Sequence, residues 1–385
     1  MVGKDQGPLP HYPMILLGEG PSLYYESDHF VPMESMKNLE TRIRHAWQGR
    51  ISGCQLGKPV EMLSMREGHA ALKDYLVSVD ALPLRDYIGY REVKNIKREW
   101  CAESITRSEP DDDINYSFLA LLMLEEYGKQ LSTADVARTW LRLLPAGVTY
   151  TAERAAYRIL MSRGNEWFAE WAEPGFDLAE CADNPYNDWI GAQIRADVYG
   201  WVCPGQPELA ADLARRDAAL SHKGEGIYGA VFVAALGAAL ADSTPEEALV
   251  RALGEIPATS EATIAVNLGM ELAGDEDGGA RIREKYEGMS PVHTLNNLAI
   301  VTWALYSHLD DFSAAIGDAV AAGLDTDCNG ATVGALWALQ GDEIPEHWTR
   351  PWQNRVGLGL AGYSEISLDD LVERTVTVAR EFTAS

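Results

Sequence analysis

The sequence has 385 residues, of which 46 % are hydrophobic and 23 % are charged. These proportions are typical of a soluble globular protein with a substantial core, and they exclude a disordered chain. The formal net charge of -26 makes nucleic acid and anionic membranes poor partners, because so acidic a surface repels phosphate groups.

The N-terminal residues carry only a short apolar patch between prolines and glycines, which is not the hydrophobic region of a signal peptide. No uncharged apolar run approaches the length that crosses a bilayer. The five cysteines are scattered and form no CxxC pair, so neither a thiolate zinc site nor a disulfide framework is indicated. The cytoplasm is therefore the expected compartment.

Residues 1–38 are rich in proline, tyrosine and glycine, which predicts an irregular N-terminal arm. Residues 39–385 are predicted to form one helical domain, because no linker of low complexity interrupts them. The mixed spacing of apolar residues within 60–105 leaves room for short strands there. Residues 132–144 begin with a capping hydroxyl and end at Pro-Ala-Gly, which predicts a helix.

Helical signals also dominate the second half of the chain. Thr244 and Glu247 form a capping box that predicts a helix ending near Ile256, before a proline. Residues 230–241 and 331–340 are apolar on nearly every side, which indicates helices inside a bundle. The fold class is therefore all-α, and it closes with a helix capped by Ser367 whose apolar face is Leu368, Leu371, Val372, Thr375, Val376 and Ala379.

Two acidic clusters each precede an apolar run that is predicted to be a helix: Asp111, Asp112 and Asp113, and then Asp325 and Asp327. Carboxylates at a helix N-terminus often act as caps. One cap suffices for a helix, however, and an unpaired charge beside a core helix is costly unless a metal ion neutralises it. Oxygen ligands of this kind prefer Mg²⁺, Mn²⁺ or Ca²⁺ to zinc. The spacing alone does not decide between helix capping and metal binding for these aspartates.

Four segments follow one another in the same order as the motifs of a known family. They are GRISGCQLGKPVE (49–61), PDDDINY (110–116), RADVYGWVCPGQPELAADLARRDAALSHKGEGIYG (195–229) and GLDTDCNGATVGALWALQG (323–341). In these segments the sequence resembles the ADP-ribosylglycohydrolase family, which includes dinitrogenase-reductase-activating glycohydrolases and ADP-ribosyl-acceptor hydrolases. The resemblance implies an all-α orthogonal bundle of many helices, with two Mg²⁺ or Mn²⁺ ions in a cleft.

The resemblance also implies roles for individual residues. The early metal-binding motif matches Asp111, Asp112 and Asp113, with aspartate in place of the family's threonine, and the late motif matches Asp325 and Asp327. Glu61 closes the first motif and is the implied general base, while Asp112 is the implied bridging or water-orienting carboxylate. Cys328 stands where the family has a ligating threonine; a water molecule could fill that coordination position, or the loop could lie differently.

Three further residues are implied to contact the substrate: Gly191, Arg195 and His222. Arg195 could bind a phosphate with two hydrogen bonds, or it could pair with Asp197. His222 precedes a cleft-lining helix in the family, although a histidine beside a capping serine is often structural. The polar residues of PVHTLNN (291–297) are interpreted as helix caps.

The implied activity is hydrolysis of a ribosyl glycosidic bond in an ADP-ribosylated protein or small molecule. Residues 189–197 depart from the family pattern, so an N-ribosyl hydrolase of a nucleoside-like metabolite is an alternative. A non-catalytic protein of the same fold is a third possibility. Retention of the acidic ligand positions favours the enzymatic interpretations.

Overall fold

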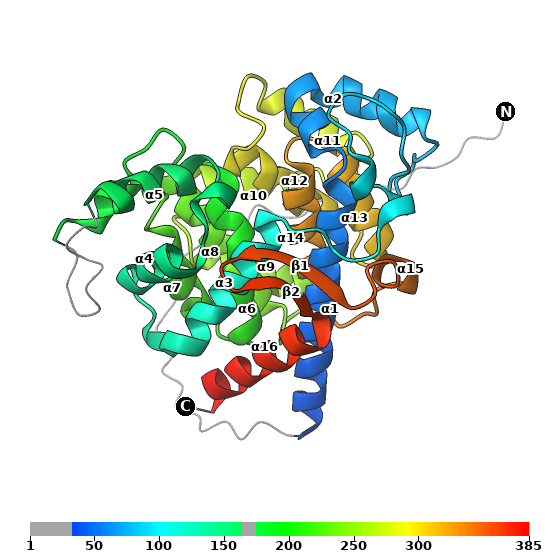
Figure 1. The fold of residues 1–385 in the computed structure, drawn as a ribbon. Helices are drawn as coiled ribbons and strands as arrows, with labels where there is room; N and C mark the ends of the chain where they lie inside the picture. Colours follow the sequence, from blue (N-terminus) through cyan, green and yellow to red (C-terminus); the bar gives the residue numbers. More distant parts are fainter. Residues whose placement is uncertain (1–32, 164–174, 385) are drawn as a thin grey trace.

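The computed structural model describes residues 33–163 and 175–384 of the chain. Within these ranges the regular structure is almost entirely helical, with a single two-stranded antiparallel sheet, which confirms the predicted all-α class (Figure 1). The α-helices are α1 (Met33–Gly57), α2 (Glu61–Ser78), α3 (Asp112–Tyr127), α4 (Thr133–Leu143), α5 (Thr151–Arg163), α6 (Asp197–Val202), α7 (Pro207–Ala218), α8 (Gly224–Ala239), α9 (Pro245–Gly254), α10 (Glu261–Glu271), α11 (Gly278–Lys285), α12 (Thr294–Ser307), α13 (Phe312–Ala321), α14 (Thr326–Ala338), α15 (Glu346–Thr349) and α16 (Leu368–Thr383).

The capping signals placed three helices correctly. The Ser132 hydroxyl accepts a hydrogen bond from the backbone N–H of Asp135 at the start of α4. The Thr244 hydroxyl likewise accepts a hydrogen bond from the Glu247 N–H at the start of α9. In both helices the acidic side chain in turn accepts a hydrogen bond from the backbone N–H of the cap residue. α9 ends at Gly254, two residues before the predicted end, and Ser367 caps α16 as predicted.

Most of the predicted irregular arm, residues 1–32, lies outside the described residues. The remaining residues of that segment, 33–38, are helical, because α1 already begins at Met33.

The strands expected within 60–105 are absent from that region, which the structure describes throughout. α2 occupies its first part, and residues 79–105 form a loop with short 3₁₀ turns at Arg98–Trp100 (η1) and Ala102–Ser104 (η2). The chain buries Leu84 and Ile88 in the core, but its backbone meets no partner strand, and an isolated strand is not stable. The strands that do form, β1 (Arg355–Leu360) and β2 (Tyr363–Ser367), are a C-terminal hairpin that the sequence analysis missed.

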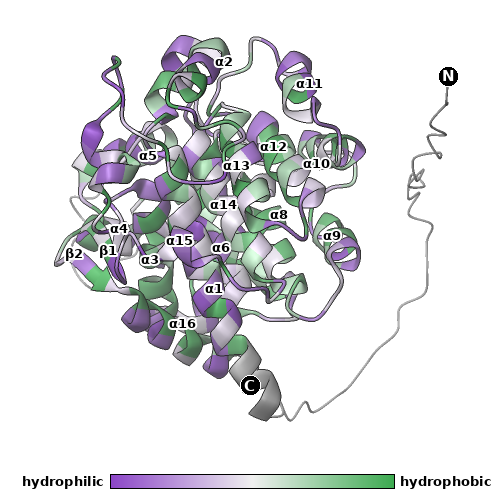
Figure 2. Ribbon diagram, turned by 90° about the vertical axis from the view of Figure 1, so that its right-hand side faces the viewer, coloured by the Kyte–Doolittle hydropathy of each residue, from purple (hydrophilic) through white to green (hydrophobic). Residues whose placement is uncertain are grey.

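The core is built around α8 and α14, the two alanine-rich helices predicted to be buried. Every residue of α14 is buried, and only the first turns of α8 reach the surface. Figure 2 shows α14 surrounded by other helices, with the more hydrophilic residues toward the outside of the molecule. No helix in the described ranges is both long enough and apolar enough to cross a bilayer.

A stripe of glycines brings α1 and α14 into backbone contact. A Cβ atom added to Gly53 would lie 1.9 Å from the carbonyl oxygen of Gly330, and one added to Gly49 would lie 2.1 Å from that of Gly334. At the end of α1, a Cβ on Gly57 would lie 2.3 Å from the Thr326 oxygen. These positions are open only to glycine, and the close crossing carries the start of α2 to the start of α14.

Candidate metal centre

The crossing of α1 and α14 places Glu61 beside the late acidic cluster. The Thr326 hydroxyl donates a hydrogen bond to the Gly57 carbonyl oxygen over 2.8 Å, which joins the two helix ends directly. Glu61 is the first residue of α2, four positions after Gly57. Asp325 and Asp327 flank Thr326, and their side chains are buried.

The loop before α14 is held in an unusual backbone conformation. Leu324 has a φ of 64°, in the left-handed region that favours glycine. Its carbonyl oxygen accepts a hydrogen bond from the Ser64 hydroxyl, and the amide oxygen of Asn297 accepts one from the Asp325 N–H. Asp325 precedes α14 but makes no side-chain cap, so capping does not explain its buried carboxylate.

The early acidic cluster begins α3. Asp111 is the N-cap, and its carboxylate accepts a hydrogen bond of 3.0 Å from the Asp113 N–H. The capping interpretation is therefore correct for this one aspartate. Asp113 is fully buried, whereas Asp112 is partly exposed. One cap satisfies the helix, so the other two carboxylates need another explanation.

The two clusters meet at one place, together with Glu61. Three groups of side chains in the described part of the chain each bring their ligand atoms within 4.8 Å of one another. Asp327 and Asp113 each belong to two groups, whereas Asp112 belongs to none. Asp327 and Asp113 therefore each lie where two ligand groups meet. The groups are Glu61 with Asp325 and Asp327, Asp113 with Asp327 and Cys328, and Cys54 with Asp111 and Asp113.

Two cationic side chains that the sequence analysis did not single out enter this centre. The Lys58 ammonium forms an ion pair with Asp111, donates to the Pro110 carbonyl oxygen over 3.1 Å and lies over the Trp100 ring. Arg50 is fully buried and bridges Asp113 and Asp197, with N–O distances of 3.2 and 2.8 Å. The position of Lys58 within the family motif GRISGCQLGKPVE (49–61) could have identified it as a candidate site residue.

Burial and the neighbouring charges shift the pKa values of the carboxylates in this centre. Burial, with Asp327 and Asp325 as the next causes, holds the pKa of Glu61 well above its usual range. Burial also raises the pKa of Asp327 to about 6, and Asp111 adds to that shift. Burial disfavours the charge of Asp111 too, but the Lys58 ammonium outweighs it and lowers the pKa of Asp111.

The charge of the centre fits bound cations. Its carboxylates are those of Glu61, Asp111, Asp112, Asp113, Asp325 and Asp327, and they outnumber the two cationic side chains Lys58 and Arg50, of which Arg50 is shared with Asp197. One oxygen of buried Asp113, Oδ2, has no hydrogen-bond partner. Unpaired buried charge is unfavourable, and divalent cations with oxygen ligands are its usual remedy.

Gly191, Arg195 and His222, the three residues expected to bind substrate, lie together around the carboxylate of Glu153, which is not one of the acidic ligands of the metal centre. Arg195 forms ion pairs with Glu153 and Asp217, at 2.7 and 3.0 Å, and Asp217 comes from α7. It also donates to the Gly191 carbonyl oxygen, and a Cβ on Gly191 would lie 2.2 Å from Glu153. His222 Nε2 lies 3.8 Å from the same Glu153 carboxylate.

This buried network changes the interpretation of Arg195. Its guanidinium is buried and its donors are taken by protein acceptors, so it is not available to a phosphate of the substrate. The alternative pairing with Asp197 is also wrong, because Asp197 binds Arg50. Burial, followed by the nearby Arg195 charge, lowers the pKa of His222 well below 6.5, so His222 is neutral. His293 caps α12, as predicted, by accepting from the Leu295 N–H.

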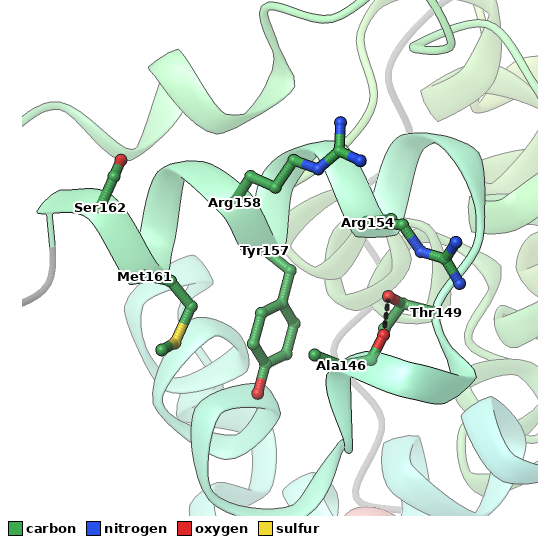
Figure 3. A pocket seen from close by; sticks show the side chains of 7 residues that line it. All are labelled: Ala146, Thr149, Arg154, Tyr157, Arg158, Met161 and Ser162. Carbon is green, nitrogen blue, oxygen red and sulfur yellow. Dashed lines mark hydrogen bonds between the residues drawn. The ribbon is translucent and has the colours of Figure 1, made fainter.

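A surface hollow of about 500 Å³ lies along α5 and the turn that precedes it. Its lining contains none of the acidic ligands, so it is not the metal centre. Figure 3 shows Tyr157 and Met161 extending from α5 on one side of it and Ala146 and Thr149 facing them. Tyr150, which precedes α5, is half-exposed, and burial followed by the charges of Asp112, Asp111 and Glu61 raises its pKa.

Comparison with known proteins agrees with the fold and the motifs. A family described as ADP-ribosylglycohydrolase matches residues 35–381. Among solved structures, the chain is similar to one titled "ADP-ribosylglycohydrolase-related protein complex", with a TM-score of 0.59. The two are 19 % identical, and the match covers 90 % of this chain and 99 % of the other, so the likeness establishes the fold. No curated protein matches the sequence.

Proposed function

The chain belongs to the ADP-ribosylglycohydrolase family, and from this premise we propose that it hydrolyses a ribosyl glycosidic bond with two divalent cations. The observation that carries the proposal is the buried carboxylate centre, in which residues far apart in the sequence bring ligand atoms together around Asp327. A non-catalytic protein would have no need to maintain so unfavourable a concentration of negative charge.

The residues suited to hold the cations are the members of the two groups that share Asp327. Mg²⁺ and Mn²⁺ suit the group of Glu61, Asp325 and Asp327, because all its ligand atoms are oxygen. Cations bound here would act as Lewis acids that orient and polarise ribose hydroxyls. Asp111 would support the centre mainly through its ion pair with Lys58.

Two carboxylates of the centre are accessible to solvent. Asp112 and Glu61 are both partly exposed, whereas Asp113, Asp325 and Asp327 are buried. Asp112 belongs to no ligand group, so it is free to orient a water molecule or to accept its proton. Glu61 is the general base implied by the family motif, and it can take that role with the carboxylate oxygen that does not serve as a ligand.

The substrate is proposed to be an ADP-ribosylated protein or small molecule, acted on in the cytoplasm. The five cysteines are all free thiols, which suits a reducing compartment. A specific observation also favours the second candidate, an N-ribosyl hydrolase of a nucleoside-like metabolite. Arg195 forms buried ion pairs with Glu153 and Asp217, so it does not offer the contact with a substrate phosphate that was expected of it.

Substitution of Asp327 by asparagine tests the proposal. Asp327→Asn removes one charge from both ligand groups, so we expect turnover to fall at least about a hundredfold while the fold persists. The stabilisation by added Mg²⁺ or Mn²⁺ in thermal melts should fall as well, because bound ligand stabilises the native state. Asp212→Asn, which removes a surface partner of Arg216, is the matched control.

Activity is to be measured on an ADP-ribosylated protein and on a nucleoside-like N-riboside, with metal in excess. The preferred substrate separates the two candidate functions. Full activity of Asp327→Asn on either substrate would contradict the proposed mechanism.

A further inference from the structure

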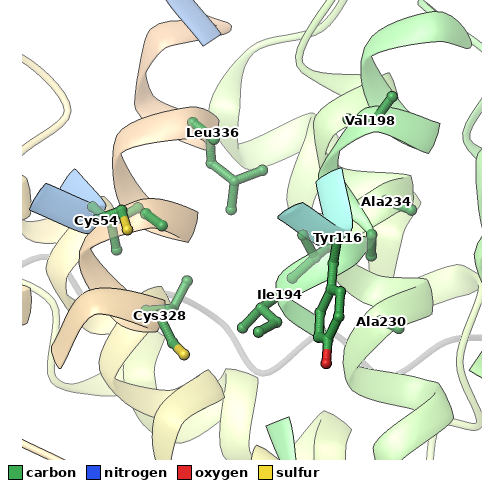
Figure 4. Packing of buried hydrophobic residues seen from close by; sticks show 14 of the residues in the cluster. Cys54, Tyr116, Ile194, Val198, Ala230, Ala234, Cys328 and Leu336 are labelled. Carbon is green, nitrogen blue, oxygen red and sulfur yellow. The ribbon is translucent and has the colours of Figure 1, made fainter. Parts of the chain in front are cut away.

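The three ligand groups of the centre differ in chemistry. One contains only carboxylates, whereas each of the other two contains a cysteine: Cys54 on α1 or Cys328 on α14. Figure 4 shows both cysteines in the same buried cluster, on these neighbouring helices. Both thiols are free. A cation that enters a cysteine-containing group would meet sulfur as well as oxygen.

The group that contains Cys54 is already neutralised by the protein. Asp111 uses Oδ2 for the Lys58 ammonium and Oδ1 for the Asp113 N–H. Lys58 is itself held in place by the Pro110 carbonyl oxygen and the Trp100 ring. The lysine therefore takes the place of a cation at this corner of the centre.

Asp113 belongs to both cysteine-containing groups and has a free ligand atom, but only the group that contains Cys328 lacks the Lys58 ammonium. Arg50 engages Oδ1 of Asp113, while Oδ2 has no partner although the residue is fully buried. Asp327 accepts a hydrogen bond from the Cys328 N–H over 3.0 Å, which fixes both residues in the first turn of α14. Asp113, Asp327 and Cys328 thus offer two oxygens and one sulfur within 4.8 Å of one another.

We propose that Asp113, Asp327 and Cys328 form a mixed oxygen–sulfur site that takes a borderline cation such as Zn²⁺, Fe²⁺ or Co²⁺. Sulfur ligands favour these ions over Mg²⁺, which prefers oxygen. The thiol proton leaves to solvent as the cation binds. The centre would then be asymmetric, with a hard cation at Glu61, Asp325 and Asp327 and a softer one beside it. This inference rests on the proposed function, because it assumes that the centre binds cations.

Cobalt(II) titration of the metal-free full-length chain, under anaerobic conditions, tests the site. A thiolate bound to Co²⁺ produces a charge-transfer band in the near ultraviolet, which oxygen ligands do not produce. We expect the wild-type protein to show this band and Cys328→Ser to lose it, with at least about tenfold weaker binding of that ion. Cys181→Ser is the matched control, since Cys181 is a buried free thiol outside all three groups.

The variants distinguish the possible failures. Asp325→Asn should retain the band, because Asp325 belongs only to the all-oxygen group. Cobalt binding without a band, or a band that persists in Cys328→Ser and disappears in Cys54→Ser, would overturn the mixed site and leave the proposed function standing. No binding of Co²⁺, Mg²⁺ or Mn²⁺ by equilibrium dialysis would reject the proposed function itself. Far-UV circular dichroism of each variant checks that it is folded.

Discussion

The contact between α1 and α14 predicts a large effect from one added methyl group. In Gly53→Ala the new Cβ would start 1.9 Å from the Gly330 carbonyl oxygen and 2.3 Å from its carbon. Ordinary contact begins at 3.4 Å, so the helices must separate by about 1.5 Å (3.4 − 1.9 Å). Both obstructing atoms belong to backbone, so no side-chain rotation can relieve the clash.

The expected loss of stability follows from two opposing terms. Overpacking a core costs about 1–3 kcal/mol and sometimes more, while replacing glycine with alanine inside a helix gains about 1 kcal/mol. Because a full helix must move here, we expect the upper end of the first range and a net loss of about 2 kcal/mol. For a chain of this length that corresponds to a fall in melting temperature of roughly 3 °C.

The same displacement should weaken the metal centre. Metal ligands tolerate errors of only about 0.2 Å, and α1 and α14 hold Glu61 against Asp325 and Asp327. We therefore expect Gly53→Ala to lose most of the thermal stabilisation that Mn²⁺ gives the wild type. Glycine-to-alanine replacement at Gly254, where a Cβ would meet nothing within 4 Å, is the control.

The assay is urea denaturation of both variants and the wild type, followed by thermal melts with and without Mn²⁺. If Gly53→Ala and Gly254→Ala had equal unfolding free energies and equal responses to Mn²⁺, the close packing of α1 and α14 would not be what positions the centre.

Two further predictions concern charged groups. Lys58→Met leaves Asp111 buried without its partner, so the metal-free protein should lose about 3 kcal/mol in urea denaturation. The same variant should gain more stability from added Mn²⁺ than the wild type does, and an unchanged gain would contradict the role of Lys58 as a substitute cation. His222 stays neutral when folded, so below about pH 6.5 only the unfolded chain binds its proton, and stability falls by up to about 1.4 kcal/mol per pH unit. His222→Gln should reduce this acid-side slope between pH 6.5 and 5.5, and parallel curves for the two proteins would refute the assignment.

Features that depend on neighbouring residues in the sequence were predictable. Ser132, Thr244 and Ser367 cap the helices expected of them, because a cap bonds to backbone only two or three residues away. The acidic clusters were identified for a similar reason: three consecutive aspartates exceed what one helix end needs. Their meeting at one place was implied by the family motifs, since spacing within each cluster says nothing of the distance between them.

Features that depend on tertiary partners could not be predicted in this way. Arg195 was expected to bind phosphate or Asp197, but its acids come from α5 and α7, and nothing near it in the sequence identifies them. Asp113 and Asp327 are each shared by two ligand groups and Asp112 belongs to none, which depends on how distant segments pack together. The hairpin of β1 and β2 was missed because its pairing, not its composition, makes it a sheet.

The glycine stripe and the carboxylates act against each other in the absence of metal. The glycines at 49, 53 and 57 let α1 reach the backbone of α14, which lowers the distance between like charges on Glu61, Asp325 and Asp327. Their mutual repulsion opposes the approach of the start of α2 to the start of α14, and protonation is the only relief that the carboxylates themselves can offer. Burial is the main cause of the raised pKa values of Glu61, Asp325 and Asp327, and neighbouring carboxylates add to the shift: Asp327 for Glu61 and Asp325, and Asp111 for Asp327. A bound cation replaces this repulsion with attraction, because it draws Glu61 at the start of α2 and the aspartates at the start of α14 towards one point. Cation binding and close packing of α1 against α14 should therefore be mutually reinforcing, as linkage requires of any ligand that binds only the native arrangement.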